Sequence, residues 1–192
     1  MGCVFVWIKI CGITRYEDAL CAAEQGADAI GFVLTRSKRR ADPEEVSVWI
    51  HELKDIEKVG VFTDEDPSEI IRIGKMLGLD TVQLHAEFVS RHRKLMEQFN
   101  IIYAVKNLSG KPVPEDIPCR ILVDPSRGCG TKGSWEKGDK PFILAGGLTP
   151  DNVREAILWA APFGVDVSSG VENAPGIKDA ALVKRFIREA RS

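Results

Sequence analysis

The sequence lacks the features of a membrane protein and of a nucleic-acid-binding protein. No apolar run reaches the roughly 20 residues that a membrane-spanning helix needs. The net charge is only −2, and the basic run 36–40 is short and isolated, as in a solvated loop. We therefore expect neither a membrane nor nucleic acid among the partners of this protein.

The chain also lacks a Cys-x-x-Cys pair and a recognisable secretion signal. Met1–Ile10 is apolar, but it has no basic leading segment and no small-residue cleavage site, so we interpret it as a first strand. The five cysteines are odd in number and widely spaced, which favours free thiols in a cytoplasmic protein over disulfides or a structural zinc site. They are Cys3, Cys11, Cys21, Cys119 and Cys129.

What the chain does have is a regular alternation of short apolar runs and helical patterns. The runs are rich in β-branched residues and nearly continuous in hydrophobicity, which is typical of parallel strands covered on both faces. Eight such runs can be counted: Val4–Ile10, Ala29–Leu34, Lys58–Phe62, Thr81–Leu84, Ile101–Val105, Arg120–Val123, Phe142–Ala145 and Val165–Val167. Their number and spacing predict a parallel α/β fold.

Eight βα units in 192 residues favour a single-domain (β/α)8 TIM barrel of minimal size, spanning residues 1–192. An open doubly wound sheet is the alternative. Two connections break the pattern. Asn107–Pro118 is proline-rich, so we expect the fifth helix to be reduced or absent, and the glycine-rich stretch Pro125–Lys140 predicts a short sixth helix after a long loop.

Several helix starts carry capping signals. Asp42 and Asp66 are each followed by a proline and, three residues on, by a glutamate, which predicts an N-cap with proline at the first helical position. Thr149-Pro150 repeats the cap and the proline, and Thr14–Glu17 has the pattern of a capping box.

The residues that could take part in a reaction come directly after the apolar runs. Cys11, His85 and Asp124 each come directly after a run, and glycine-rich turns follow the last two runs. Reactive groups at the carboxyl ends of parallel strands are typical of an active site on the C-terminal face of a β/α barrel.

The two glycine-rich turns, 145–150 and 166–171, predict a phosphate site. Glycine lets the backbone approach a ligand closely, and β/α barrels commonly hold a phosphate between their seventh and eighth loops. We expect Val171–Lys178 to supply a short extra helix at this site. Tight turns without a ligand are the alternative.

Each reactive residue could also have a purely structural role. Strand parity places Lys9 with Cys11 and Gln83 with His85, so Lys9 and Gln83 are expected inside the barrel as polar contacts of its core. Cys11 alone could be a small buried hydrophobe, Asp124 a helix cap, and His85 a hydrogen-bonded orienting residue. Nothing in the spacing asks for a metal site.

The order of these motifs resembles the phosphoribosylanthranilate isomerase family of tryptophan biosynthesis over essentially the whole chain. The most specific matches are the first and last motifs, Ile8–Thr14 and Val165–Glu172. Between them lie matching segments at Asp18–Leu20, Gly26–Phe32, Ser37–Arg39, Val59–Phe62, Val82–His85 and Gly146–Leu148.

The resemblance implies an isomerase that needs no cofactor. It would convert N-(5′-phosphoribosyl)anthranilate into 1-(2-carboxyphenylamino)-1-deoxyribulose 5-phosphate by an Amadori rearrangement. Family positions match Cys11 as general base, Asp124 as general acid, Arg39 as the carboxylate-binding arginine and Asp166 as an active-site carboxylate. The expected substrate-binding set is completed by His85, Gly146, Gly147, Ser168, Ser169 and Gly170.

The chain departs from the family pattern in two loops. The loop before Ser37 is one residue short, which leaves open whether Arg36, Arg39 or Arg40 meets the carboxylate. The loop after Asp124 reads Gly-Cys-Gly-Thr-Lys-Gly at 128–133, a rearranged form of the family's glycine-rich loop. We expect a monomer or a homodimer.

Two other functions compete with this interpretation. A histidine-pathway or bifunctional phosphoribosyl isomerase uses the same rearrangement, but families of that kind have an aspartate where this chain has Cys11. A non-catalytic phosphosugar-binding barrel would need the glycine turns but neither Cys11 nor Asp124.

Overall fold

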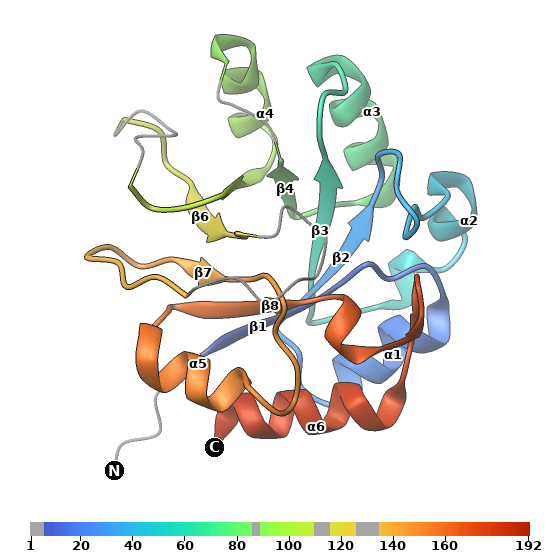
Figure 1. The fold of residues 1–192 in the computed structure, drawn as a ribbon. Coiled ribbons are helices and arrows are strands. Elements are labelled where there is room, and N and C mark those ends of the chain that lie inside the picture. The colour runs from blue at the N-terminus through green and yellow to red at the C-terminus, as the bar shows by residue number, and fades with distance from the viewer. Residues whose placement is uncertain (1–5, 86–88, 110–115, 126–134) are drawn as a thin grey trace.

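The protein forms a closed barrel of eight parallel strands with helices on its outside (Figure 1). The structure is a computed structural model that describes residues 6–85, 89–109, 116–125 and 135–192. The strands follow one another around the barrel in chain order, and β1 closes the circle by pairing in parallel with β8. They are β1 Trp7–Cys11, β2 Ala29–Val33, β3 Glu57–Phe62, β4 Thr81–Leu84, β5 Asn100–Val105, β6 Arg120–Val123, β7 Ile143–Leu144 and β8 Gly164–Val167.

The predicted (β/α)8 barrel is thus confirmed, and each of the eight predicted runs overlaps one strand, with boundaries that differ by a few residues. The fifth and sixth connections also differ from the rest as expected. In the described parts of these connections, 106–109, 116–119, 124–125 and 135–142, the structure has no helix. The remaining residues of both connections lie outside the described ranges, and the predicted short sixth helix falls partly there.

The helices that the structure describes lie outside the strands. They are α1 Tyr16–Glu24, α2 Pro43–Ser47, α3 Pro67–Leu77, α4 Arg93–Met96, α5 Val153–Ala160 and α6 Ala180–Arg191, with single 3-10 turns η1 Ile50–Glu52, η2 Ser90–His92 and η3 Ser169–Val171.

Two predicted caps are confirmed and two are wrong. The Asp42 carboxylate accepts hydrogen bonds from the backbone N–H groups of Glu44 and Glu45, and that of Asp66 accepts one from Ser68. The expected capping box at Thr14 does not form, because α1 begins after Arg15 without a side-chain cap and the Thr14 hydroxyl donates to the Gly176 carbonyl instead. The predicted cap at Thr149 does not form either, because α5 begins at Val153 after Asn152 without a side-chain cap, and Thr149 accepts the Asp151 N–H in a turn before the helix.

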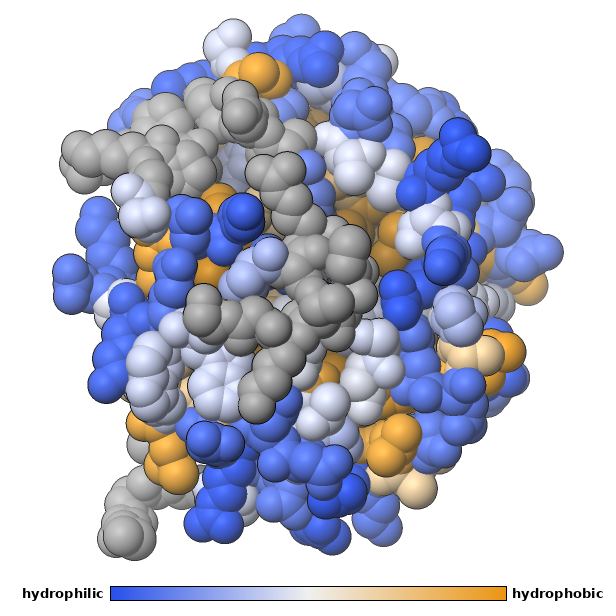
Figure 2. All heavy atoms as spheres, in the orientation of Figure 1, coloured by the Kyte–Doolittle hydropathy of each residue, from blue (hydrophilic) through white to orange (hydrophobic). Residues whose placement is uncertain are grey.

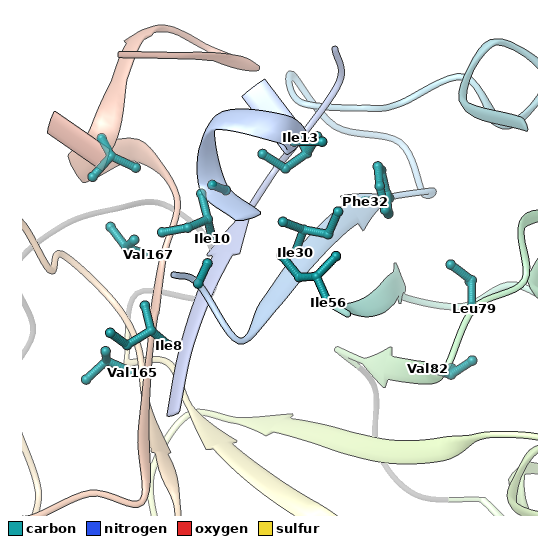
Figure 3. Packing of buried hydrophobic residues seen from close by; sticks show 14 of the residues in the cluster. Ile8, Ile10, Ile13, Ile30, Phe32, Ile56, Leu79, Val82, Val165 and Val167 are labelled. Atoms are coloured by element: carbon teal, nitrogen blue, oxygen red, sulfur yellow. The ribbon is translucent and has the colours of Figure 1, made fainter. Parts of the chain in front are cut away.

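Strand periodicity divides the core into two layers. Residues of one parity fill the barrel and form an inner cluster of Trp7, Ala29, Val59, Ile102, Leu122, Ile143 and Ala145. Residues of the other parity pack between the strands and the helices, and Figure 3 shows Ile8, Ile10, Val165 and Val167 of this outer layer beside β1 and β8. Each fully buried Ile or Val contributes roughly 1.5–3 kcal/mol to folding.

The surface seen in Figure 2 is mainly hydrophilic, with small separate hydrophobic groups. Within the described ranges, no helix combines the length and the apolarity that crossing a membrane requires.

One element after β8 differs from the prediction. We expected Val171–Lys178 to supply a short helix, but η3 ends at Val171 and the chain continues as a two-stranded antiparallel hairpin, β9 Glu172–Ala174 and β10 Ile177–Lys178. The hairpin turns at Gly176, whose φ of 82° suits glycine. Its ends bring Glu172 and Lys178 together, since the Lys178 ammonium donates to the Glu172 carboxylate at 2.8 Å.

Candidate active site

The predicted site residues lie together at the C-terminal end of the barrel. Cys11 is the last residue of β1, His85 and Asp124 directly follow β4 and β6, and Asp166 lies within β8. The loop after β2 carries Arg39, and the turns after β7 and β8 carry Gly146, Gly147, Ser168, Ser169 and Gly170. Because all eight strands are parallel, these positions share one mouth of the barrel.

Cys11 is held in the barrel wall by a sharp turn. The next residue, Gly12, has a φ of 77°, and the backbone N–H groups of Gly12 and Ile13 both donate to the Gly31 carbonyl at 2.9 Å. A Cβ atom on Gly12 would stand 2.9 Å from Arg39 Cδ and 2.9 Å from Ser168 Oγ. Glycine at this position therefore allows three loops to converge above Cys11.

Lys9 lies beneath Cys11 in the barrel interior. It is fully buried, and its ammonium donates to Asp166 Oδ1 at 2.8 Å across the pairing of β1 with β8. Burial would lower the pKa of Lys9, but the facing Asp166 and Cys11 raise that pKa above its ordinary value, so the ammonium stays charged. A buried charge with its partner removed costs about 3–5 kcal/mol, so Lys9 and Asp166 depend on each other.

Burial and nearby charges act in opposite directions on the pKa of the Cys11 thiol. Burial raises the pKa of the Cys11 thiol above its ordinary value, while the charges of Lys9 and Lys178 and a hydrogen bond from Lys9 act to lower it. Gly31 makes the close approach of Lys9 possible, since a Cβ atom there would stand 2.8 Å from Cys11 Sγ and 3.1 Å from Lys9 Nζ.

A second buried cation, Lys178, comes from the hairpin. It donates to the Glu172 carboxylate and, at 3.3 Å, to the Ser168 carbonyl. Arg39 Nε donates to both oxygens of the same Glu172 carboxylate at 2.9 Å. Burial alone would raise the pKa of Glu172, but the hydrogen bonds from Arg39 and Lys178 hold that pKa below its ordinary value.

The other two arginines of this loop point elsewhere. Arg36 and Arg40 line a separate cavity between the loop after β2 and α3, together with the acidic side chains of Asp42, Glu65 and Glu69. Arg39 is thus the arginine of this loop that lies beside Gly12 and Ser168.

Asp124 and His85 face the site from the other side of the barrel. Asp124 is 7% exposed, and its Oδ1 lies so close to Gly146 that a Cβ atom there would stand 2.8 Å away. Burial lowers the pKa of His85 although Asp124 acts in the opposite direction, so the imidazole is neutral at pH 7. Its Nε2 lies 2.8 Å from the Gln83 amide nitrogen, which orients the ring.

The two glycine turns after β7 and β8 touch each other. A Cβ atom on Gly170 would stand only 1.9 Å from the Leu148 carbonyl oxygen, so this contact is possible only for glycine. Asn152 fixes the first turn by donating to the Gly147 carbonyl and accepting from the Thr149 N–H. The buried Ser168 hydroxyl has no hydrogen-bond partner among the described residues, which leaves it available to a ligand.

Sequence reasoning missed two members of this site. Glu172 was seen only as part of a motif, and Lys178 carried no signal, because its place depends on a hairpin where we expected a helix. Lys9 and Gln83 are buried inside the barrel as strand parity predicted. Among the described residues, no three His, Cys, Asp or Glu side chains form a group that could hold a metal ion.

Comparison with known proteins places these motifs in a family. A family model described as N-(5′-phosphoribosyl)anthranilate (PRA) isomerase matches residues 8–189. The N-(5′-phosphoribosyl)anthranilate isomerase of Geobacter sulfurreducens is 42% identical over 200 residues, which cover 97% of this chain and 98% of that protein. The enzyme of the same name from Thermotoga maritima is 40% identical over 202 residues, with 97% and 98% covered.

Solved structures agree. A monomeric form of the dimeric phosphoribosylanthranilate isomerase from Thermotoga maritima has a TM-score of 0.83 and 38% identity, covering 98% of this chain and 100% of that one. A phosphoribosyl anthranilate isomerase in complex with reduced 1-(o-carboxyphenylamino)-1-deoxyribulose 5-phosphate has a TM-score of 0.83 and 39% identity, covering 97% and 98%.

Proposed function

The chain belongs to the N-(5′-phosphoribosyl)anthranilate isomerase family, and we propose that it carries out the family's rearrangement with Cys11 as general base and Asp124 as general acid. The protein is an isomerase of tryptophan biosynthesis. Its substrate is N-(5′-phosphoribosyl)anthranilate, and its product is 1-(2-carboxyphenylamino)-1-deoxyribulose 5-phosphate.

The observation that carries the acid–base proposal is the placement of Cys11 and Asp124. Both side chains are 7% exposed, and they lie at the same mouth of the barrel, at the ends of β1 and β6. Ring opening requires a proton on the furanose oxygen, and the Asp124 carboxylic acid supplies it. The iminium that forms makes the C2′ proton acidic, and the Cys11 thiolate removes it. Loss of that proton gives the enol of the product ketose.

The pH dependence follows from the surroundings of the thiol. Because burial raises the pKa of Cys11, the thiol form dominates at pH 7, and the thiolate fraction grows as the pH rises. We therefore expect the acidic limb of the kcat profile to follow the ionisation of Cys11. His85, neutral at pH 7, binds the substrate by hydrogen bonding rather than by charge.

The reaction itself is tested by mixing the purified protein with N-(5′-phosphoribosyl)anthranilate and following the loss of the substrate's fluorescence. Loss above the spontaneous rate is expected. The absence of any such loss would contradict the assigned isomerase activity.

We propose that Arg39 binds the anthranilate carboxylate. Its Nε donates to the Glu172 carboxylate, and the two terminal nitrogens of the guanidinium bind the substrate carboxylate. A charge-assisted pair contributes roughly 1.5–3 kcal/mol, so Arg39→Ala should lower kcat/KM about 10- to 100-fold. Arg36→Ala and Arg40→Ala are the matched controls, because those side chains line the separate cavity. A larger loss in either control would move the carboxylate to that arginine.

We propose that the phosphate is bound by backbone N–H groups of the turns at 146–147 and 168–170, together with the Ser168 and Ser169 hydroxyls. The contact between Gly170 and Leu148 supports this, since it brings the two turns side by side. Asp166 contacts the substrate with the oxygen that Lys9 does not hold.

The phosphate proposal predicts a selective rise in KM. In Gly170→Ala the new methyl group would overlap the Leu148 carbonyl and push the turns apart, so KM should rise at least about tenfold while kcat changes less. Steady-state kinetics with matched circular dichroism checks this. Gly26→Ala is the control for backbone strain alone, because its φ of 88° disfavours alanine but its methyl group meets no atom within 4 Å and it lies before β2, at the opposite end of the barrel from the site. An unchanged KM in folded Gly170→Ala would place the phosphate elsewhere.

The remaining proposals concern the state of the protein in the cell. We propose a cytoplasmic location, where Cys11, Cys21 and Cys119 stay reduced, as all three are free thiols in the structure. We also propose a monomer or a homodimer, which sedimentation analysis distinguishes.

A further inference from the structure

Among the charged groups around Cys11, Lys9 has the largest effect on the pKa of the thiol. It precedes Cys11 by two residues on β1, so both side chains enter the barrel on the same face of the strand. Sulfur and ammonium nitrogen both lie within 3.1 Å of the point where a Gly31 Cβ atom would stand. The ammonium is fully buried, and its side chain is hydrogen-bonded to that of Cys11.

Asp166 holds this ammonium from the neighbouring strand. The register pairs Lys9 with Asp166, and Asp166 Oδ1 accepts the Lys9 hydrogen bond at 2.8 Å. The carboxylate therefore fixes the lysine, and the lysine faces the thiol. This order resembles the way in which a buried aspartate orients a catalytic histidine in other enzymes, with lysine in the middle position.

The other charged groups around Cys11 do not replace Lys9. Lys178 approaches from β10, but it is held by Glu172 and by the Ser168 carbonyl, and Glu172 also binds Arg39. Burial lowers the pKa of Lys178 despite the hydrogen bond to Glu172. From β2, the uncharged Gly31 faces the thiol, and His85 and Asp124 follow β4 and β6 on the other side of the barrel.

We propose that Lys9 is a positioning residue that increases the fraction of Cys11 present as the thiolate base, and that Asp166 holds the Lys9 ammonium in place while its own negative charge acts in the opposite direction. This inference rests on the proposed role of Cys11. When the thiolate takes the C2′ proton it becomes a neutral thiol, and the Lys9 ammonium keeps its own proton throughout. Lys9 thus supplies a fixed positive charge and no proton.

The proposal predicts that Lys9→Met and Asp166→Asn shift the pKa of the Cys11 thiol in opposite directions. Removing the positive charge in Lys9→Met should raise the pKa of Cys11 by at least about one unit, which is tenfold less thiolate at pH 7. Removing the negative charge in Asp166→Asn should lower the same pKa. Lys178→Met should raise it by less than Lys9→Met does. A purely structural disturbance would have no reason to reverse sign between the two main variants.

The measurement is an ultraviolet titration of thiolate absorbance on the purified full chain. Each variant is compared with the same variant carrying Cys11→Ala, so that the difference reports Cys11 alone among the five cysteines. Lys75→Met, on the exposed side of α3, is the control for loss of a lysine charge and should leave the titration unchanged. If Lys9→Met does not fold, Asp166→Asn still gives a signed prediction.

Activity provides the second readout. In Lys9→Met the kcat at pH 7 should fall at least about tenfold and recover as the pH rises, because more thiolate forms. Equal shifts of one sign in Lys9→Met and Asp166→Asn, or no shift in Lys9→Met, would overturn the inference. The titration requires no turnover, so it tests the role of Lys9 independently of catalysis. A failure of the acid–base proposal would instead be seen as normal activity of Cys11→Ala.

Discussion

Cys11→Ala should lower kcat by at least about 100-fold, since general acid–base catalysis typically supplies about 10²- to 10⁴-fold for each group. Binding of a product analogue should remain nearly intact, because the phosphate turns and Arg39 lie in other loops of the barrel mouth. Steady-state kinetics and calorimetric titration with the reduced product analogue separate the two effects.

Matched cysteine variants serve as controls for this prediction. Cys21 lies on α1 and Cys119 directly before β6, so Cys21→Ala and Cys119→Ala should retain normal kcat. Cys11→Ser should also be poor, because a hydroxyl ionises far less readily than a thiol. Near-normal turnover of Cys11→Ala would make Cys11 a packing residue and direct the search for the base to Asp166 and His85.

Asp124→Asn should lower kcat by a similar factor of at least about 100, because an amide of the same shape cannot deliver a proton to the furanose oxygen. The amide keeps much of the local packing, including the contact with Gly146, so KM should change little. Steady-state kinetics of the folded variant, with its fold checked by circular dichroism, separates the two parameters.

The control for Asp124 is an exposed aspartate. Asp139 is exposed and lies in the segment before β7. Asp139→Asn should therefore have the same kcat and KM as the unmodified enzyme. If Asp124→Asn keeps its kcat, the proton comes from another group, and His85, which faces the same side of the site, is the next candidate.

Features that depend on nearby residues could be predicted from the sequence. The eight strands followed from their continuous apolar runs, because a strand buried on both faces must be hydrophobic throughout. The caps at Asp42 and Asp66 followed from residues two or three positions away. Parity along β1 and β4 also placed Lys9 and Gln83 inside the barrel.

The candidate site was predictable in its position but not in its contacts. Closure of a parallel barrel brings the carboxyl ends of all strands to one mouth, so residues that follow the strands must meet there. The resemblance of the motifs to the isomerase family supplied the roles proposed for Cys11, Asp124 and Arg39. Neither source indicated which charges would surround the thiol.

Those charges were decided by contacts between distant parts of the chain. Lys9 and Asp166 are 157 positions apart, and they meet because β8 closes the barrel against β1. Arg39 donates to Glu172, 133 positions away in the sequence. The Thr14 hydroxyl donates to the Gly176 carbonyl, 162 positions away, instead of forming the predicted cap. Local patterns set strands and caps because their partners are neighbours in sequence, whereas buried charges take partners that only the closed barrel brings within hydrogen-bonding distance.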